Sequence, residues 1–136
     1  MSVETLFKSY CARFNARDLD PLVSLFWPYA LFEMPLLGQR IFGESEIRGS
    51  HQRIFDLSEY ALIDISAFKT SGPVIIAEGT LDSKLLRDNM PVDMPLAMTM
   101  QDVDGKIVRL SVYLDARPYR LWADGPVLAP RDIHIH

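Results

Sequence analysis

Cysteine, long apolar runs and clustered positive charge are scarce in this sequence, and each scarcity excludes a class of protein. The single cysteine, Cys11, allows no intrachain disulfide, which indicates a reducing compartment. No apolar run has the length of a signal peptide's core or of a membrane-spanning helix. The net charge of −4, with no run of Lys or Arg, argues against nucleic acid and acidic membranes as partners. We therefore expect a cytoplasmic protein with no nucleic-acid or membrane partner.

Apolar residues are plentiful by contrast. They make up 49% of the 136 residues, which suffices for one compact domain with a full core. No internal repeat or low-complexity segment interrupts the chain. We expect a single domain over residues 1–136, with its core at about 2–119. A linker-like tail at about 120–136 contains Pro126 and Pro130.

The first part of the chain has the apolar spacing of three helices. Ser2 is placed to cap the first helix, Asp18 or Asp20 the second, and the third begins in the segment 43–46. The expected buried stripes are Val3, Leu6, Phe7, Tyr10 and Phe14; then Leu22, Leu25 and Phe26; then Ile47, His51, Ile54 and Phe55.

Strands dominate the rest of the chain. We expect them over residues 29–37, 60–68, 74–86, 91–103 and 106–115. Helices followed by mostly antiparallel strands predict an α+β fold. The expected architecture is a cone: a strongly bent, mostly antiparallel sheet with three helices from the N-terminal half packed on its concave face.

The last two strands form the clearest local motif. The dipeptide Asp104-Gly105 between two alternating runs predicts a hairpin with a two-residue turn, in which Val103 faces Lys106. Counting outward from that pair divides the side chains between two faces. One face carries Ala97, Leu110 and Val112, and the other carries Met98, Met100 and Tyr113. Because both faces are apolar, we expect the first to line a pocket and the second to contact another copy in a homodimer.

Several segments together resemble a known family. The helix pair, ALFEMP (30–35), GESEIRGSH (43–51), SGPVIIAEGT (71–80) and DVDGKIVRLSVYLD (102–115) are similar to the SnoaL-like branch of the nuclear transport factor 2-like superfamily. Ketosteroid isomerases, limonene epoxide hydrolases, scytalone dehydratases and SnoaL-type polyketide cyclases belong to that superfamily. The resemblance covers residues 2–119 and implies a conical fold, usually dimeric through the outer sheet face. It does not specify an activity, because this fold carries many.

The ketosteroid isomerase pattern is only partly present. The resemblance places its oxyanion-hole tyrosine on Tyr10, its general base on Met34 and its second oxyanion donor on Ala97. Methionine and alanine can neither move a proton nor donate a hydrogen bond. That isomerase mechanism is therefore disfavoured.

The epoxide hydrolase pattern is missing as well. The acid that these enzymes carry on the last strand falls on Val112, and valine cannot activate water. These enzymes also carry an Arg and an Asp two residues apart on an earlier strand. The nearest matches in this sequence are Glu78 with Thr80, or Thr80 with Asp82. Neither pair contains an arginine.

The remaining candidates for chemistry each have an ordinary structural alternative. Tyr10 and His51 lie in apolar helix stripes. At such positions each is either a core residue with one hydrogen-bond partner or a functional residue of a pocket. Glu78 lies in the middle of a strand among apolar neighbours. It is therefore either a buried functional carboxylate, or a structural one that is paired with another group or lies at the rim of the sheet. Cys11 has no base nearby in sequence, and His134 with His136 alone is too little for a metal site.

Two hypotheses follow, from different classes. The first is a cofactor-independent isomerase, cyclase or dehydratase that acts on a hydrophobic cyclic or polyketide-like substrate. In it Tyr10 holds an oxyanion and His51 or Glu78 moves the proton. The second is a ligand-binding or dimeric interaction protein without chemistry. In both, a small hydrophobic molecule is the partner. The expected pocket residues are Phe14, Met34, Thr80, Ala97, Leu110 and Val112.

Overall fold

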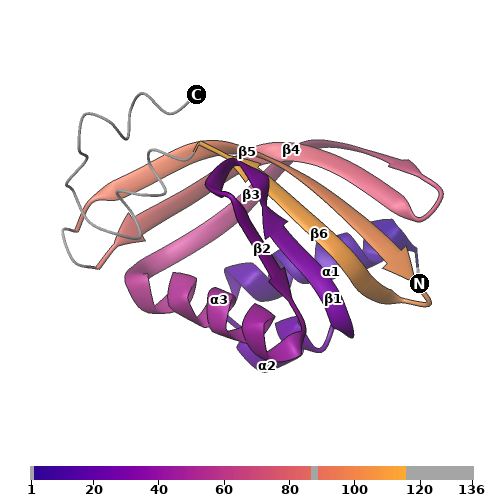
Figure 1. Ribbon diagram of the computed structural model, residues 1–136. Helices are drawn as coiled ribbons and strands as arrows, with labels where there is room; N and C mark the ends of the chain where they lie inside the picture. Colours follow the sequence, from indigo (N-terminus) through magenta and orange to yellow (C-terminus); the bar gives the residue numbers. More distant parts are fainter. Residues whose placement is uncertain (1, 87–88, 116–136) are drawn as a thin grey trace.

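The computed structural model describes residues 2–86 and 89–115. Two helices open the chain, two strands and a 3₁₀ turn precede the third helix, and four strands follow it (Figure 1). The helices are α1 (Val3–Asn15), α2 (Leu19–Val23), the 3₁₀ turn η1 (Pro35–Leu37) and α3 (Glu44–Leu57). The strands are β1 (Phe26–Met34), β2 (Gln39–Phe42), β3 (Ser58–Ser71), β4 (Val74–Leu85), β5 (Pro91–Val103) and β6 (Lys106–Leu114).

The strands form one bent sheet that arches over the helices. Its order is β2-β1-β6-β5-β4-β3, and among these neighbours only β1 and β6 run parallel. Helices α1, α2 and α3 lie beneath the concave face (Figure 1). This is the expected α+β cone. No helix in the described ranges is long and apolar enough to cross a membrane.

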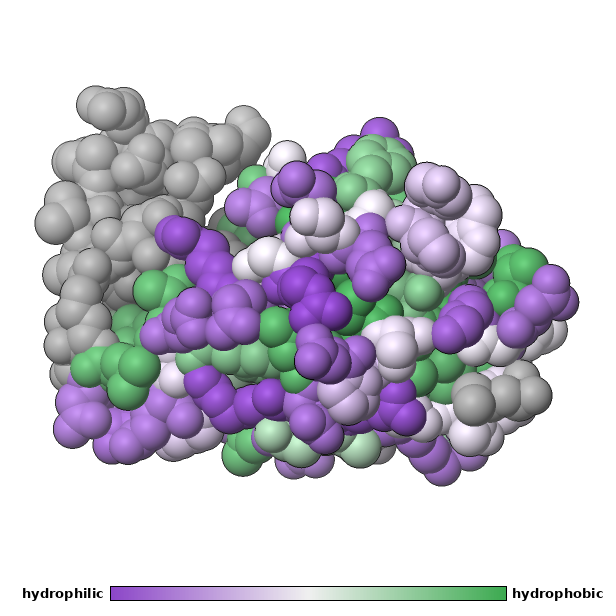
Figure 2. All heavy atoms as spheres, turned by 90° about the horizontal axis from the view of Figure 1, so that it is seen from below, coloured by the Kyte–Doolittle hydropathy of each residue, from purple (hydrophilic) through white to green (hydrophobic). Residues whose placement is uncertain are grey.

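Helix α1 forms as its sequence predicts. The Ser2 hydroxyl accepts a hydrogen bond from the Thr5 backbone N–H at 3.1 Å, which satisfies one of the free donors at the helix start. The predicted apolar stripe is the buried side of the helix. The opposite side is exposed, and on the helix side of the molecule hydrophilic residues cover much of the surface, with hydrophobic ones between them (Figure 2). Burial of one stripe thus fixes α1 against the sheet.

The region after α2 differs from the expectation. Helix α2 ends at Val23, so Leu25 and Phe26 of the expected stripe lie beyond it, and β1 begins at Phe26 instead of residue 29. After β1, η1 and a turn at Gly38, with φ of +69°, lead back into β2, which the sequence did not predict. Strand β2 has only four residues, and its burial does not alternate, so it leaves no periodic signal.

The hairpin of β5 and β6 has the predicted turn but not the predicted faces. Val103 pairs with Lys106 as expected, yet Gln101 pairs with Arg109 instead of Val108, because a β-bulge leaves Val108 unpaired. Beyond the bulge every partner shifts by one, which exchanges the two faces of β6 relative to β5. Met98 now lies opposite Val112, and Met100 lies opposite Leu110.

The expected grouping of side chains on the hairpin is therefore wrong. Met98 and Met100 are 0% and 1% exposed and belong to the interior, so neither is on the outer face. Ala97 pairs with Tyr113, and both lie on the outer face of the sheet. Of the three residues predicted for a dimer contact, only Tyr113 is positioned for one.

Candidate functional site

Tyr10 and His51 form a buried polar pair inside the cone. Tyr10 comes from the middle of α1 and His51 from the middle of α3, 41 residues later. The Tyr10 hydroxyl and His51 Nε2 are 2.8 Å apart, and the two side chains are only 2% and 0% exposed. Rings of Phe14, Phe26 and Phe32 surround the imidazole. The structure thus brings two of the three predicted catalytic residues into contact.

The hydrogen bonds fix the tautomer of the imidazole. His51 Nδ1 lies 2.8 Å from the backbone carbonyl oxygen of Ile47, one turn earlier in α3. A carbonyl oxygen only accepts, so Nδ1 must carry the proton and donate. In neutral imidazole Nε2 then has a lone pair and no proton. Tyr10 is therefore the donor in the Tyr10–His51 bond, and the tyrosine's only O–H proton is committed to the histidine.

Burial keeps both members of the pair uncharged at neutral pH. Desolvation lowers the pKa of His51 from 6.5 to about 4, against the opposing effect of its bond to the Ile47 carbonyl. Desolvation also raises the pKa of Tyr10 well above its ordinary value, with a smaller contribution from Cys11. His51 is therefore a weak base, and Tyr10 is a neutral phenol.

A small apolar cavity adjoins this pair. It has about 30 Å³ of free space, room for one or two water molecules. Tyr10 is the one side chain with a strong hydrogen-bonding group among its lining residues, which are Tyr10, Phe14, Phe32, Met34, Ile54, Ile63, Leu81, Leu96, Met98, Val112 and Leu114. Phe14, Met34 and Val112, which were expected to line a pocket, are among these residues.

Other predicted site residues lie elsewhere. Glu78 and Thr80 point to the outer face of β4 and are exposed, since Ile75, Ala77 and Leu81 are the inward set. Glu78 pairs with Ala97 on that outer face, so neither can reach the cavity. Leu110 is fully buried but does not line the cavity. Glu78 therefore cannot act on the same ligand as Tyr10.

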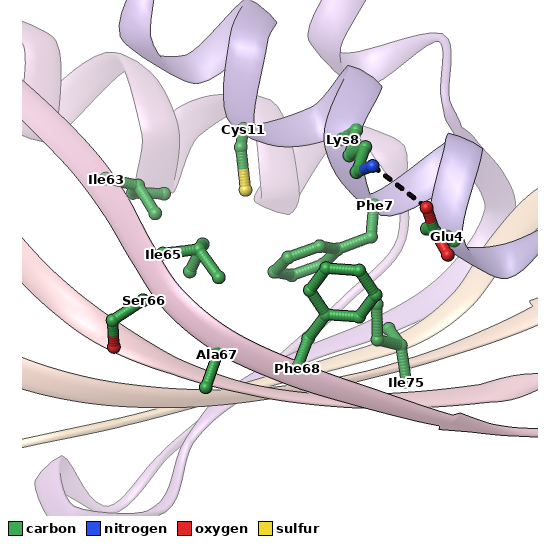
Figure 3. A pocket seen from close by; sticks show the side chains of 10 residues that line it. All are labelled: Glu4, Phe7, Lys8, Cys11, Ile63, Ile65, Ser66, Ala67, Phe68 and Ile75. Atoms are coloured by element: carbon green, nitrogen blue, oxygen red, sulfur yellow. Dashed lines mark hydrogen bonds and ion pairs between the residues drawn. The ribbon is translucent and has the colours of Figure 1, made fainter.

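A larger cleft lies between α1 and the β3–β4 hairpin, and the sequence reasoning did not find it. It encloses about 440 Å³ and is mainly apolar (Figure 3). The rings of Phe7 and Phe68 lie close together within it, and a Lys8–Glu4 ion pair of 2.8 Å lies at its edge. Cys11 also lines it, but desolvation raises the pKa of this thiol to about 12. The thiol is therefore a poor nucleophile there.

Glu33 is the buried carboxylate of the outer face. It alternates along β1 with Phe32 and Met34, which line the cavity, and points away from them. Its Oε1 accepts hydrogen bonds from Ser111 Oγ at 2.7 Å and from Arg109 at 2.6 Å. The Ser111 bond, followed by the arginine, lowers the pKa of Glu33 despite its desolvation. Glu33 is thus an ion held between strands, with no route to the cavity.

No group of three or more potential metal ligands occurs within residues 2–86 and 89–115. His134 and His136, considered above as a metal pair, lie outside the described residues, as does the predicted tail at about 120–136.

Comparison with known proteins identifies the fold. No family model and no curated protein matches the chain. Solved structures do match, each over most of both chains. A ketosteroid isomerase-like fold protein from Catenulispora acidiphila, solved with trimethylamine, has a TM-score of 0.78 and 16% identity over 89% of this chain and 93% of its own. A candidate SnoaL-like polyketide cyclase from Shewanella denitrificans has a TM-score of 0.80 and 12% identity, over 91% and 98%.

A third structure, TerC co-crystallised with polyporic acid, has a TM-score of 0.78 and 17% identity, over 90% of this chain and 98% of its own. These identities are low, but the scores agree. The chain has the ketosteroid isomerase-like fold, which confirms at the level of the fold the resemblance in the sequence.

Proposed function

We propose that the chain binds a small, mainly apolar molecule in the cone cavity, with Tyr10 as its single polar contact. The observation that carries this proposal is the composition of the lining: apolar side chains and one phenol fixed by His51. An apolar enclosure with few, precisely placed polar groups is the usual design of a small-molecule site.

The size of the ligand follows from the side chains that can move. The free space of about 30 Å³ is less than a ring-shaped molecule needs. Met34 and Met98 both line it, and methionine has an unbranched, adaptable side chain that repacks easily. We therefore propose a ligand about the size of one ring, admitted when these two side chains move aside.

Two proteins of the same fold give this proposal general support. One was solved with trimethylamine and another was co-crystallised with polyporic acid. Both names describe small molecules held by this type of scaffold, although identities of 16% and 17% transfer no ligand to this chain.

Filling the cavity tests the proposal. The substitution Val112→Ile adds one methyl group in a space of about 30 Å³, and we expect it to weaken binding of small cyclic probes (cyclopentanol, cyclopentanone, toluene) by about tenfold or more. Ala67→Val, which adds bulk in the cleft instead, is the matched control and should change nothing. Binding is measured by titration of methionine methyl resonances. If no probe shifts the Met34 or Met98 signals, the proposed site is wrong.

The Tyr10–His51 bond also favours a second candidate, an isomerase, cyclase or dehydratase acting on a cyclic or polyketide-like substrate. In such a reaction the Tyr10 oxygen would take a proton from the substrate while Tyr10 gives its own proton to His51 Nε2. A base with a pKa of about 4 makes that transfer unfavourable at neutral pH, so we rank binding first. Chemical conversion of a bound probe, lost in Tyr10→Phe, would instead establish an enzyme.

A second copy of the chain is the partner we propose for the outer sheet face. At its centre the small side chains of Ala97 and Thr99 lie beside the half-buried Tyr113 and the 59% exposed Ile76. Small side chains at such a centre allow two sheets to approach closely. Thr99→Arg should then yield monomers in sedimentation velocity, while Thr5→Arg on the exposed side of α1 should not. A monomeric parent protein would refute the dimer.

A further inference from the structure

The hydrogen-bonding capacity of Tyr10 in the cavity is restricted. A phenol has one proton to donate and lone pairs that accept. The Tyr10 proton goes to His51 Nε2 at 2.8 Å. Within the described residues no group donates to the Tyr10 oxygen in return. A ligand group that reaches the Tyr10 oxygen therefore meets it as an acceptor of hydrogen bonds.

The Ile47 carbonyl, which accepts a hydrogen bond from His51 and not from Tyr10, is the origin of this restriction on Tyr10. His51 Nδ1 lies 2.8 Å from that oxygen and donates its proton to it. In the other tautomer Nδ1 would have no proton, and its lone pair would face a lone pair of the carbonyl oxygen. The imidazole is 0% exposed, so water cannot compensate either nitrogen. If Tyr10 turned its proton toward a ligand, His51 Nε2 would be left buried without a partner, which is costly.

We infer that this cavity selects ligands whose polar group donates a hydrogen bond, such as an alcohol or a phenol, over ketones of the same shape. The inference rests on the proposed function and names the ligand class for that site. Tyr10 accepts from the ligand hydroxyl while it donates to His51. A ketone brings only a second acceptor, so it faces the Tyr10 lone pairs without a bond. This is the opposite of the oxyanion-donor role that the sequence predicted for Tyr10.

The remaining lining supplies no alternative partner for a ketone. Apart from Tyr10 it consists of phenylalanine, aliphatic and methionine side chains, and a thioether is at best a weak acceptor. The preference must therefore disappear when the Tyr10 oxygen is removed. It must also shrink when His51 no longer takes the Tyr10 proton, because the phenol can then donate to the oxygen of either ligand.

Cyclopentanol and cyclopentanone test the inference, because they share a ring and differ in the polar group. We expect the parent protein to bind the alcohol about tenfold more tightly. Tyr10→Phe should bind the two equally, and His51→Leu should lose most of the preference for the alcohol. Tyr113→Phe, which removes a hydroxyl from the outer face, is the matched control and should keep the parent preference.

The outcomes separate the inference from the proposal beneath it. Equal affinities in the parent protein, or tighter binding of the ketone, overturn the inference and leave the proposed binding site intact. Binding of neither probe overturns both. The comparison within the parent protein needs no variant to fold, and thermal melting confirms folding of each variant before its affinities are used.

Discussion

Acidification from pH 7 to pH 4 is expected to cost the protein about 3 kcal/mol of unfolding free energy through His51 alone. The pKa of this residue is about 4 in the folded chain, against 6.5 for an ordinary histidine. Between these values the unfolded chain binds a proton that the folded chain excludes. The free energy of unfolding therefore rises with pH in this window, and it falls as the pH drops from 6.5 toward 4.

The measurement is urea unfolding at half-unit steps of pH, for the parent and for His51→Leu. The parent should show a slope between pH 6.5 and 4, and the variant should lose most of it while being less stable overall at pH 7. Glu33, whose lowered pKa adds stability that is lost below about pH 4.5, acts only at the acid end of this window and contributes to both proteins alike. Identical slopes in the two proteins would show that His51 is not buried in neutral form.

Replacing Gly79 by alanine is expected to destabilise the fold by about 3 kcal/mol or more, because the new methyl group has no room. A Cβ at Gly79 would stand 2.0 Å from the Asp64 carbonyl oxygen and 2.8 Å from Ile65 Cα. Both are backbone atoms of β3, next to the irregularity between Ile65 and Ala67. Since β4 is paired on both sides, the sheet cannot yield without losing hydrogen bonds.

Gly49→Ala is the matched control, made at a glycine inside α3 where nothing lies within 4 Å of the added Cβ. There alanine should stabilise the protein by roughly 0.5–1 kcal/mol through helix propensity. Urea unfolding of both variants should thus give changes of opposite sign. A Gly79→Ala protein as stable as the parent would contradict the close approach of β3 and β4.

The sequence was most informative where the signal was local. The cap at Ser2, the apolar stripe of α1 and the turn at Asp104-Gly105 depend on neighbouring residues, and all three form as predicted. The bulge at Val108 could not be predicted in the same way. The stretch after the turn carries apolar residues in either register, so no pattern shows where pairing shifts. One unpaired residue then reversed the faces of the whole strand.

The site itself was half predictable. Tyr10 and His51 were recognisable as polar residues within apolar stripes, but their contact depends on how α1 packs against α3. The prediction that Glu78 reaches the pocket was wrong because both faces of β4 carry apolar residues. Ile76, which is 59% exposed, lies on the same outer face as Glu78. The cleft beside Phe7 and Phe68 left no signal, since it is a gap between elements and its residues are individually ordinary.

The account depends most on a neutral His51 that carries its proton on Nδ1. Two-dimensional ¹⁵N NMR of the imidazole measures this directly, because protonated and unprotonated ring nitrogens have well-separated chemical shifts. We predict a protonated Nδ1 and an unprotonated, hydrogen-bonded Nε2, unchanged from pH 8 to pH 5. A proton on Nε2, or a titration midpoint near pH 6.5, would contradict the account.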